Sequence, residues 1–156
     1  IGATSTVNGI VLASRAIGAA FISAFGARHL AKRFGLTGAT GLGLGLMALT
    51  LMTIPVLRQL SQIIPAAILF GFGFGTVMPT LYSALADLTP SELRSSVLAV
   101  GTGAGYLGQF LCPILLGFVL SHSGLPEVFY SAASIALVTA LLLLIPIADK
   151  SAGTSG

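Results

Sequence analysis

One arginine stands inside an otherwise uncharged stretch near the start of the sequence. Arg15 is preceded by Thr4 and Asn8, and at about 100° per residue these three side chains share one narrow stripe of a helix. An arginine at the centre of a membrane costs about 2.5–3.5 kcal/mol on insertion scales, so its presence there points to a function. The chemistry that such a stripe could perform is recognition of a negatively charged group.

The partner of Arg15 is left open by the sequence. The acidic residues all fall at predicted helix ends or in loops, and they are Asp87, Glu92, Glu127 and Asp149. The partner is therefore expected to be a carboxylate on a segment outside this chain, an anionic substrate, helix carbonyls or cavity water. Alternatively, the guanidinium extends to the membrane surface or braces helix packing.

A second polar stripe is predicted on the stretch 91–120, beside a stripe of small residues. A glutamine side chain can form four hydrogen bonds, and hydrocarbon offers it no partner. Gln109 should therefore point into protein or a water-filled cavity. Small residues let neighbouring helices approach closely. The candidates for substrate binding or coupling are Asn8, Arg15, Tyr82, Tyr106 and Gln109. The candidates for helix packing are Gly101, Gly105, Gly108 and Pro113.

Glycines and a proline mark the stretch 63–86. Gly71, Gly73 and Gly75 have the spacing of a nucleotide-binding loop, but no predicted strand precedes them, so we reject that interpretation. Pro79 has no N–H and is expected to free a backbone carbonyl and to bend the helix. A further packing stripe is predicted on the stretch 37–55, at Gly38, Gly41, Gly45 and Ala48.

Catalytic and metal-binding patterns are not found in the sequence. His29 and His122 fall on opposite sides of the predicted membrane, and neither has a cysteine, histidine or carboxylate at metal-ligand spacing. The serines have no acid or base in the same predicted layer. We therefore expect no enzyme activity, no cofactor and no metal site.

The elements that position these residues are predicted to be membrane helices. Of the 156 residues, 55% are hydrophobic and only 7% are charged, with a mean hydropathy of +1.03, whereas a soluble domain carries about 25% charged residues. The scattered basic residues lack the dense patch that nucleic-acid binding needs.

A membrane span needs about 20 apolar residues, and the stretches that are long enough are 4–25, 37–55, 63–86, 91–120 and 127–147. The prediction is an all-α, polytopic membrane bundle of five helices.

The turn before the fourth span carries helix-start chemistry. Thr89, Pro90 and Glu92 predict a threonine N-cap, a proline in the first turn and a capping glutamate. Asp87 and Arg94 flank the same turn, where we expect a structural ion pair.

Lysine and arginine are distributed unequally between the two predicted sides. One side, which includes the tail 149–156, holds Arg28, Lys32, Arg33, Arg94 and Lys150, while the other holds Arg58. Because positive residues resist translocation, the first side and the C-terminal tail are predicted to be cytoplasmic. The odd number of spans and the missing initiating Met predict the back part of a longer polypeptide. A five-span bundle that lost its start codon is the alternative.

The stretch GARHLAKRFG at 26–35 resembles the loop motif of the major facilitator superfamily, Gly-x-Leu-Ala-Asp-Arg-x-Gly-Arg. The matching residues are Leu30, Ala31, Arg33 and Gly35. Arg28 stands at the motif's first glycine and Lys32 at its aspartate. The stretches 90–94 and 108–117 are similar to the tenth loop and eleventh helix of that superfamily. The resemblance implies cytoplasmic gating-loop candidates at Arg28, Lys32, Arg33 and Gly35.

The resemblance further implies an incomplete C-terminal half, helices eight to twelve of a twelve-helix transporter. It implies secondary active transport of a small molecule, with proton-coupled efflux as the leading expectation. Uptake of a small metabolite and a non-transporting membrane subunit are the alternatives. The implied partners are the lipid bilayer, the N-terminal helices, the substrate and protons, and the expected location is a bacterial inner membrane. The first, third and fourth spans would face a central cavity, and the other two would face lipid.

Overall fold

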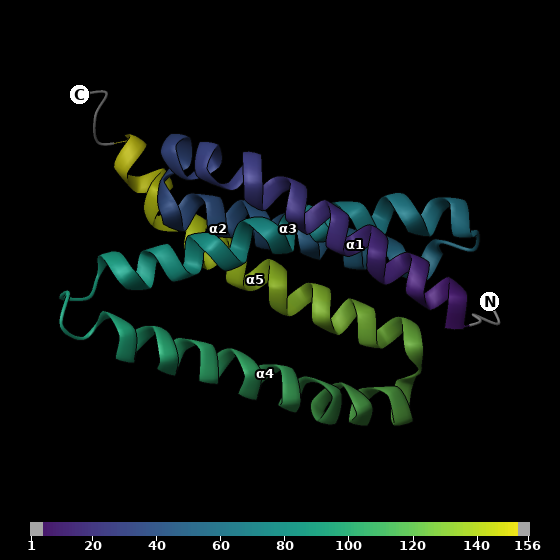
Figure 1. Cartoon of the computed structure of the whole chain (residues 1–156). Helices are drawn as coiled ribbons and strands as arrows, with labels where there is room; N and C mark the ends of the chain where they lie inside the picture. The colour runs from purple at the N-terminus through teal and green to yellow at the C-terminus, as the bar shows by residue number, and fades with distance from the viewer. Residues whose placement is uncertain (1–4, 153–156) are drawn as a thin grey trace.

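The computed structural model describes the backbone of residues 5–152 and the side chains of residues 5–145. Its helices are α1 (Ser5–Phe25), α2 (Ala27–Thr53), η1 (Ile54–Val56, a 3-10 turn), α3 (Leu60–Asp87), α4 (Arg94–Ser123) and α5 (Leu125–Ala152) (Figure 1). The five long helices are each apolar and long enough to cross a membrane. The prediction of an all-α bundle of five membrane helices is confirmed.

Two helices run beyond their predicted ends. α2 begins at Ala27 because residues 27–34 form a helical segment of their own, which Gly35 joins to the rest of the helix. Gly35 has φ 73° and ψ 169°, a conformation that favours glycine. α5 continues to Ala152, so the first half of the predicted tail is helical. Thr4 and residues 153–156 of that tail lie outside the described residues.

The turn between α3 and α4 differs from the predicted N-cap. The Thr89 hydroxyl donates to the Leu85 carbonyl at 2.6 Å, so it closes the end of α3 instead of beginning the next helix. The Leu93 N–H donates to the Pro90 carbonyl at 3.1 Å, which forms a separate turn. α4 therefore begins only at Arg94.

The side chains of this turn form local hydrogen bonds. The Arg94 Nε donates to the Ala86 carbonyl at 3.1 Å, one residue before Asp87. The expected ion pair between Arg94 and Asp87 is not found among the described residues. The Ser91 hydroxyl donates to the Glu92 carboxylate at 2.9 Å. The backbone N–H of Glu92, and then this hydroxyl, lower the pKa of Glu92 below its ordinary value.

Close contact between α1 and α3 depends on glycines that lack a Cβ. A methyl group added at Gly71 would collide with the carbonyl oxygen of Arg15, and one added at Gly75 would collide with that of Ala19. Gly18 of α1 faces α3 in the same way, against the carbonyl of Ile68. The two backbones therefore touch, which is how helices pack where lipid removes the hydrophobic driving force.

α2 packs against α3 with one face and against α5 with another. A Cβ at Gly43 would lie 2.9 Å from the carbonyl oxygen of Gly73 on α3. A Cβ at Gly41 would lie 2.9 Å from Leu144 Cγ on α5. Gly45 has no such neighbour within 4 Å in the described chain. α2 thus packs with two of its faces inside the described bundle. The lipid-facing position that the family resemblance implies for this helix in a complete transporter remains a prediction.

The carbonyl freed by Pro79 is found and is satisfied by another helix. α3 continues through Pro79 as a helix, so the missing N–H leaves the Gly75 carbonyl without its usual donor. The Ser23 hydroxyl on α1 donates to this carbonyl at 2.7 Å. Ser23 thereby replaces the backbone hydrogen bond that the proline removes.

This substitution of one donor for another gives a testable prediction. Ser23→Ala is expected to lower the free energy of unfolding by about 1–3 kcal/mol, because the Gly75 carbonyl loses its donor. In a Pro79→Ala background the restored N–H supplies that donor, so the same change should cost about 1 kcal/mol less. Melting temperatures of the four proteins of this double-mutant cycle in detergent measure the difference.

Ser14→Ala is the matched control for the cycle, since the one hydrogen bond of the Ser14 hydroxyl in the described chain is to the Ile10 carbonyl of its own helix, at 2.8 Å. It should change the melting temperature little in either background. Equal losses from Ser23→Ala with and without Pro79 would contradict the proposed compensation.

α4 is the most exposed helix of the described bundle and lies at its edge (Figure 1). A Cβ at Gly101 would lie 2.9 Å from Leu85 Cδ1 on α3, while Gly105 and Gly108 have no such neighbour within 4 Å in the described chain. Gly108 lines an apolar cavity of about 520 Å³ between α2, α4 and α5. The packing role of Gly105, Gly108 and Pro113 remains a prediction.

Candidate functional site

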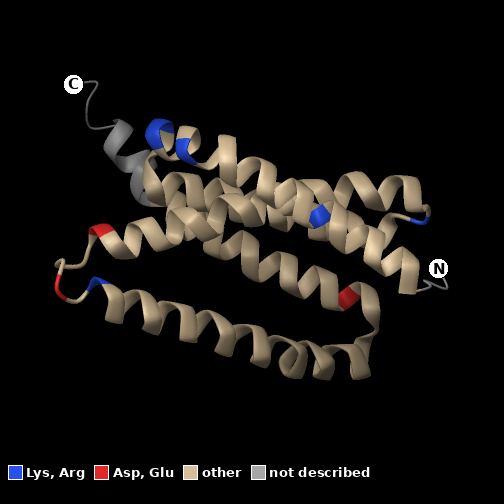
Figure 2. Ribbon diagram, viewed as in Figure 1, with Lys and Arg blue, Asp and Glu red and all other residues tan. Residues whose placement is uncertain are grey.

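Arg15 lies midway along α1 with its guanidinium against α3. Its guanidinium carbon is 4.7 Å from the ring centroid of Phe74 and 5.3 Å from that of Phe70. Such cation–π contacts contribute about 0.5–1 kcal/mol at exposed sites and about 2 kcal/mol where water is excluded. The close backbone approach at Gly71 brings the arginine to the two rings. In Figure 2 one basic residue lies midway along α1, and the charges of the neighbouring helices gather near the ends.

The aromatic contacts leave the charge of Arg15 available. A ring face attracts the guanidinium but accepts no full hydrogen bond from its five N–H donors. No ion pair or hydrogen bond of this guanidinium is found among the described residues. A cavity of about 320 Å³ opens beside it, lined by Leu12, Arg15, Ala16, Ala19 and Phe74. The arrangement can hold a small anion whose apolar part contacts the Phe74 ring.

Phe70 and Phe74 are not among the site residues that the sequence predicts. They are four residues apart and flank Gly71, so on a helix they share a face with the residue that allows close approach. That pattern indicates an aromatic face of the helix at a point of close helix contact. With nine phenylalanines in the chain, the pattern became specific only once Arg15 was located beside it.

The other predicted binding residues do not line the Arg15 cavity. Asn8 lies nearer the start of α1 and is exposed, and Tyr82 lies half-buried toward the end of α3. Tyr106 and Gln109 are exposed on α4. Their roles in substrate binding or coupling remain predictions.

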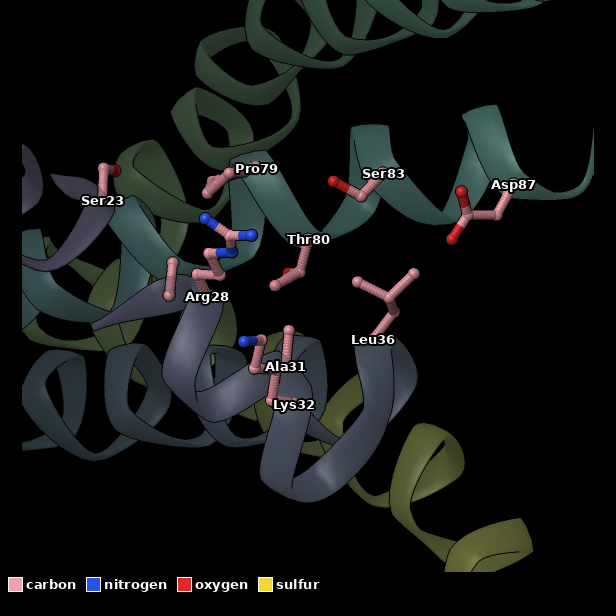
Figure 3. Close-up of a pocket in the computed structure, with 10 residues that line it drawn as sticks. Ser23, Arg28, Ala31, Lys32, Leu36, Pro79, Thr80, Ser83 and Asp87 are labelled. Carbon is pink, nitrogen blue, oxygen red and sulfur yellow. The ribbon is translucent and has the colours of Figure 1, made fainter. Parts of the chain in front are cut away.

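A second cavity, of about 490 Å³, opens where α1 turns into α2. Its walls come from α1, α2 and α3, and it is lined by Ser23, Ala27, Arg28, Ala31, Lys32, Leu36, Pro79, Thr80, Ser83 and Asp87 (Figure 3). The structure therefore brings two gating-loop candidates, Arg28 and Lys32, to one cavity. Arg33 does not line it, and its guanidinium carbon lies 5.7 Å from the ring centroid of Phe34.

The described residues contain no group of three or more histidine, cysteine or acidic side chains that could hold a metal ion.

The sequence profile of the Major Facilitator Superfamily matches residues 1–156. The chain belongs to this superfamily. A Mus musculus protein named "Probable small intestine urate exporter" is 28% identical over 141 residues, which are 89% of this chain and 28% of that protein. An uncharacterized MFS-type transporter of Bacillus subtilis (strain 168), YuxJ, is 28% identical over 102 residues, which are 64% of this chain and 26% of that transporter. No solved structure matches the chain.

Membership confirms that the chain resembles this superfamily. Membership in a transporter family also agrees with the prediction that the chain is not an enzyme. Together with the five apolar helices, it shows that the chain is part of an integral membrane protein. The aligned segments cover little more than a quarter of the length of each of these two relatives, at 28% and 26%.

Proposed function

We propose that this chain forms helices eight to twelve of a secondary active transporter that exports a small organic anion in exchange for protons. The observation that carries the proposal is Arg15, a charge midway along a membrane helix that is held by two aromatic rings and faces a cavity. In a medium of low dielectric constant, such a cation attracts a negatively charged group strongly. The similarity to the tenth loop and eleventh helix of the superfamily supports the C-terminal assignment.

The name of one relative supports the proposed substrate class and the proposed direction of transport. The Mus musculus relative is named as a probable urate exporter, and urate is a small organic anion with a flat ring. The pairing of Arg15 with the Phe74 ring suits such a molecule, since its negative charge can meet the guanidinium while its plane contacts the phenyl ring.

Proton coupling needs a group that titrates within the membrane, and a carboxylate is the one expected here. The acidic residues whose side chains the structure describes each lie at a helix end or in a turn, and these are Asp87, Glu92 and Glu127. We therefore assign the titrating group to helices outside this chain. In this proposal, the same helices pair with the chain to give alternating access.

The proposed orientation follows the basic residues. Figure 2 shows most basic residues at the end of the bundle where α1 turns into α2 and where α3 turns into α4, and these are Arg28, Lys32, Arg33 and Arg94. The opposite end holds Arg58. We propose that the first end faces the cytoplasm of a bacterial cell, together with the C-terminus.

Inverted membrane vesicles that contain the full-length protein test the proposal. They are expected to accumulate radiolabelled urate or benzoate while their lumen is acidified, and to lose the accumulated anion when nigericin dissipates the pH gradient. Accumulation only in right-side-out vesicles would instead support the uptake alternative. Flux equal to that of vesicles without the protein would support a non-transporting subunit.

Cysteine labelling verifies which side of the membrane faces outward in these vesicles. In a Cys112→Ser background, Ser91→Cys in the turn before α4 should react with an impermeant maleimide added to inverted vesicles. Ser123→Cys at the other end of α4 should react only in right-side-out vesicles or whole cells. Labelling of both from one side would contradict the membrane-spanning orientation of α4.

A further inference from the structure

The cavity where α1 turns into α2, called here the Arg28 cavity, has the composition of an anion site that is separate from Arg15. We propose that it binds a phosphate-class oxyanion, either free phosphate or the phosphate of a lipid headgroup. Its volume of about 490 Å³ exceeds what one phosphate group fills, so a headgroup fits as well as a hydrated ion.

Two cations project into the Arg28 cavity from one helical segment. Arg28 and Lys32 are four residues apart before the break at Gly35, so they share one face of the segment, and Figure 3 shows both beside Thr80. Like charges at this spacing repel each other. No ion pair of either is found among the described residues. An oxyanion between them would relieve the repulsion, and the arginine fork matches a phosphate with two parallel hydrogen bonds.

Of the hydroxyl groups that line the cavity, two already donate to backbone carbonyls and one is available to a ligand. Thr80 is 2% exposed, and its hydroxyl donates to the Thr76 carbonyl at 2.7 Å. The Ser23 hydroxyl is committed to the Gly75 carbonyl. Ser83 is exposed on the cavity wall, and no hydrogen bond of its hydroxyl is found in the described chain. Ser83 can therefore donate to a bound oxyanion.

Asp87 makes one end of the cavity acidic, while the other end is basic. Figure 3 shows its carboxylate at the far end of the row from Pro79 to Asp87, with Ser83 between it and the Arg28 end. A carboxylate repels an oxyanion, and the repulsion falls with distance. The anion is thus expected at the Arg28 and Lys32 end of the cavity, and removal of the Asp87 charge should strengthen its binding.

The test uses the purified full-length protein in neutral detergent with inorganic phosphate and with phosphatidylglycerol as probes, and phosphatidylcholine as the lipid control. The half-saturating concentration is taken from the shift in melting temperature. Arg28→Ala and Lys32→Ala are each expected to raise it about fivefold, as one basic residue near an anionic surface does. Asp87→Asn is expected to lower it about twofold. Arg28→Lys keeps the charge without the fork and should fall between wild type and Arg28→Ala.

Arg33→Ala is the matched control, because Arg33 has the same charge on the same segment but lies against Phe34 outside the cavity. It should leave the half-saturating concentration of either probe unchanged. A response to phosphate alone assigns the site to a soluble ion, and a response to phosphatidylglycerol alone assigns it to a headgroup. Absence of both responses, an effect of Arg33→Ala equal to that of Arg28→Ala, or weaker binding in Asp87→Asn would overturn the proposal.

Discussion

Replacing Arg15 by alanine is expected to lower substrate flux about 100-fold per folded molecule and to leave the folded yield unchanged or raised. Truncating one partner of a desolvated charge pair costs about 2–5 kcal/mol, and about 2.7 kcal/mol corresponds to the 100-fold loss. Folding loses only the contacts with the Phe70 and Phe74 rings. It gains the free energy that an arginine at the membrane centre costs to insert.

The measurement is urate or benzoate flux in proteoliposomes of the full-length protein, normalised to monodisperse protein by gel filtration. Arg15→Lys separates charge from geometry, because lysine keeps the charge but loses the planar five-donor fork. We expect it to recover less than a tenth of wild-type flux. Phe74→Leu keeps Arg15 but removes the nearer ring, so it should raise the KM for aromatic anions more than that for aliphatic ones.

Two results would contradict a role of Arg15 in binding. Wild-type flux in both Arg15→Ala and Arg15→Lys would make the residue one that extends to the membrane surface. A loss of folded yield in Arg15→Ala would make it a brace of the α1–α3 contact, which is the structural alternative left open by the sequence.

The features of the fold that the sequence predicted are those that depend on local chemistry. The five helices follow from long apolar stretches between charged turns, because a bilayer demands continuous apolar helices. The freed carbonyl before Pro79 follows from the missing N–H. Its donor, Ser23, is 52 residues away from Gly75 in sequence, so only the packing of α1 on α3 could reveal it.

The features that the sequence did not predict depend on which helix lies beside which. A stripe of small residues indicates one face of a helix, but α2 packs with two faces. The predicted stripe therefore includes Gly45, which has no neighbour within 4 Å in the described chain, and omits Gly43, which contacts α3. The sequence indicates a polar partner for Arg15, whereas the structure places aromatic rings of α3 against its guanidinium. The turn at Thr89 closes the preceding helix because its hydroxyl reaches the Leu85 carbonyl. Helix-start residues alone do not distinguish these two uses.

The largest expected effect on folding is that of Gly71→Ala. An added methyl group would collide with the carbonyl oxygen of Arg15 and lie 3.0 Å from the Ala19 nitrogen, both backbone atoms of α1. Because backbone cannot rotate away as a side chain can, α1 must move off α3. We expect the free energy of unfolding to fall by about 3 kcal/mol or more, at the upper end of overpacking effects. The readout is folded yield and melting temperature of the full-length protein in detergent.

Gly45→Ala provides the matched control, because it makes the same chemical change in a membrane helix where no atom would lie within 4 Å of the new methyl group in the described chain. Alanine favours helix over glycine by about 1 kcal/mol, so this variant should be as stable as wild type or slightly more so. Gly71→Ala carries the same propensity gain, and the difference between the two variants therefore isolates the cost of the collision. Equal stability of both would mean that α1 and α3 do not touch at Gly71. The position of Arg15 over the Phe70 and Phe74 rings would then lose its structural basis, since that close approach is what brings the guanidinium to them.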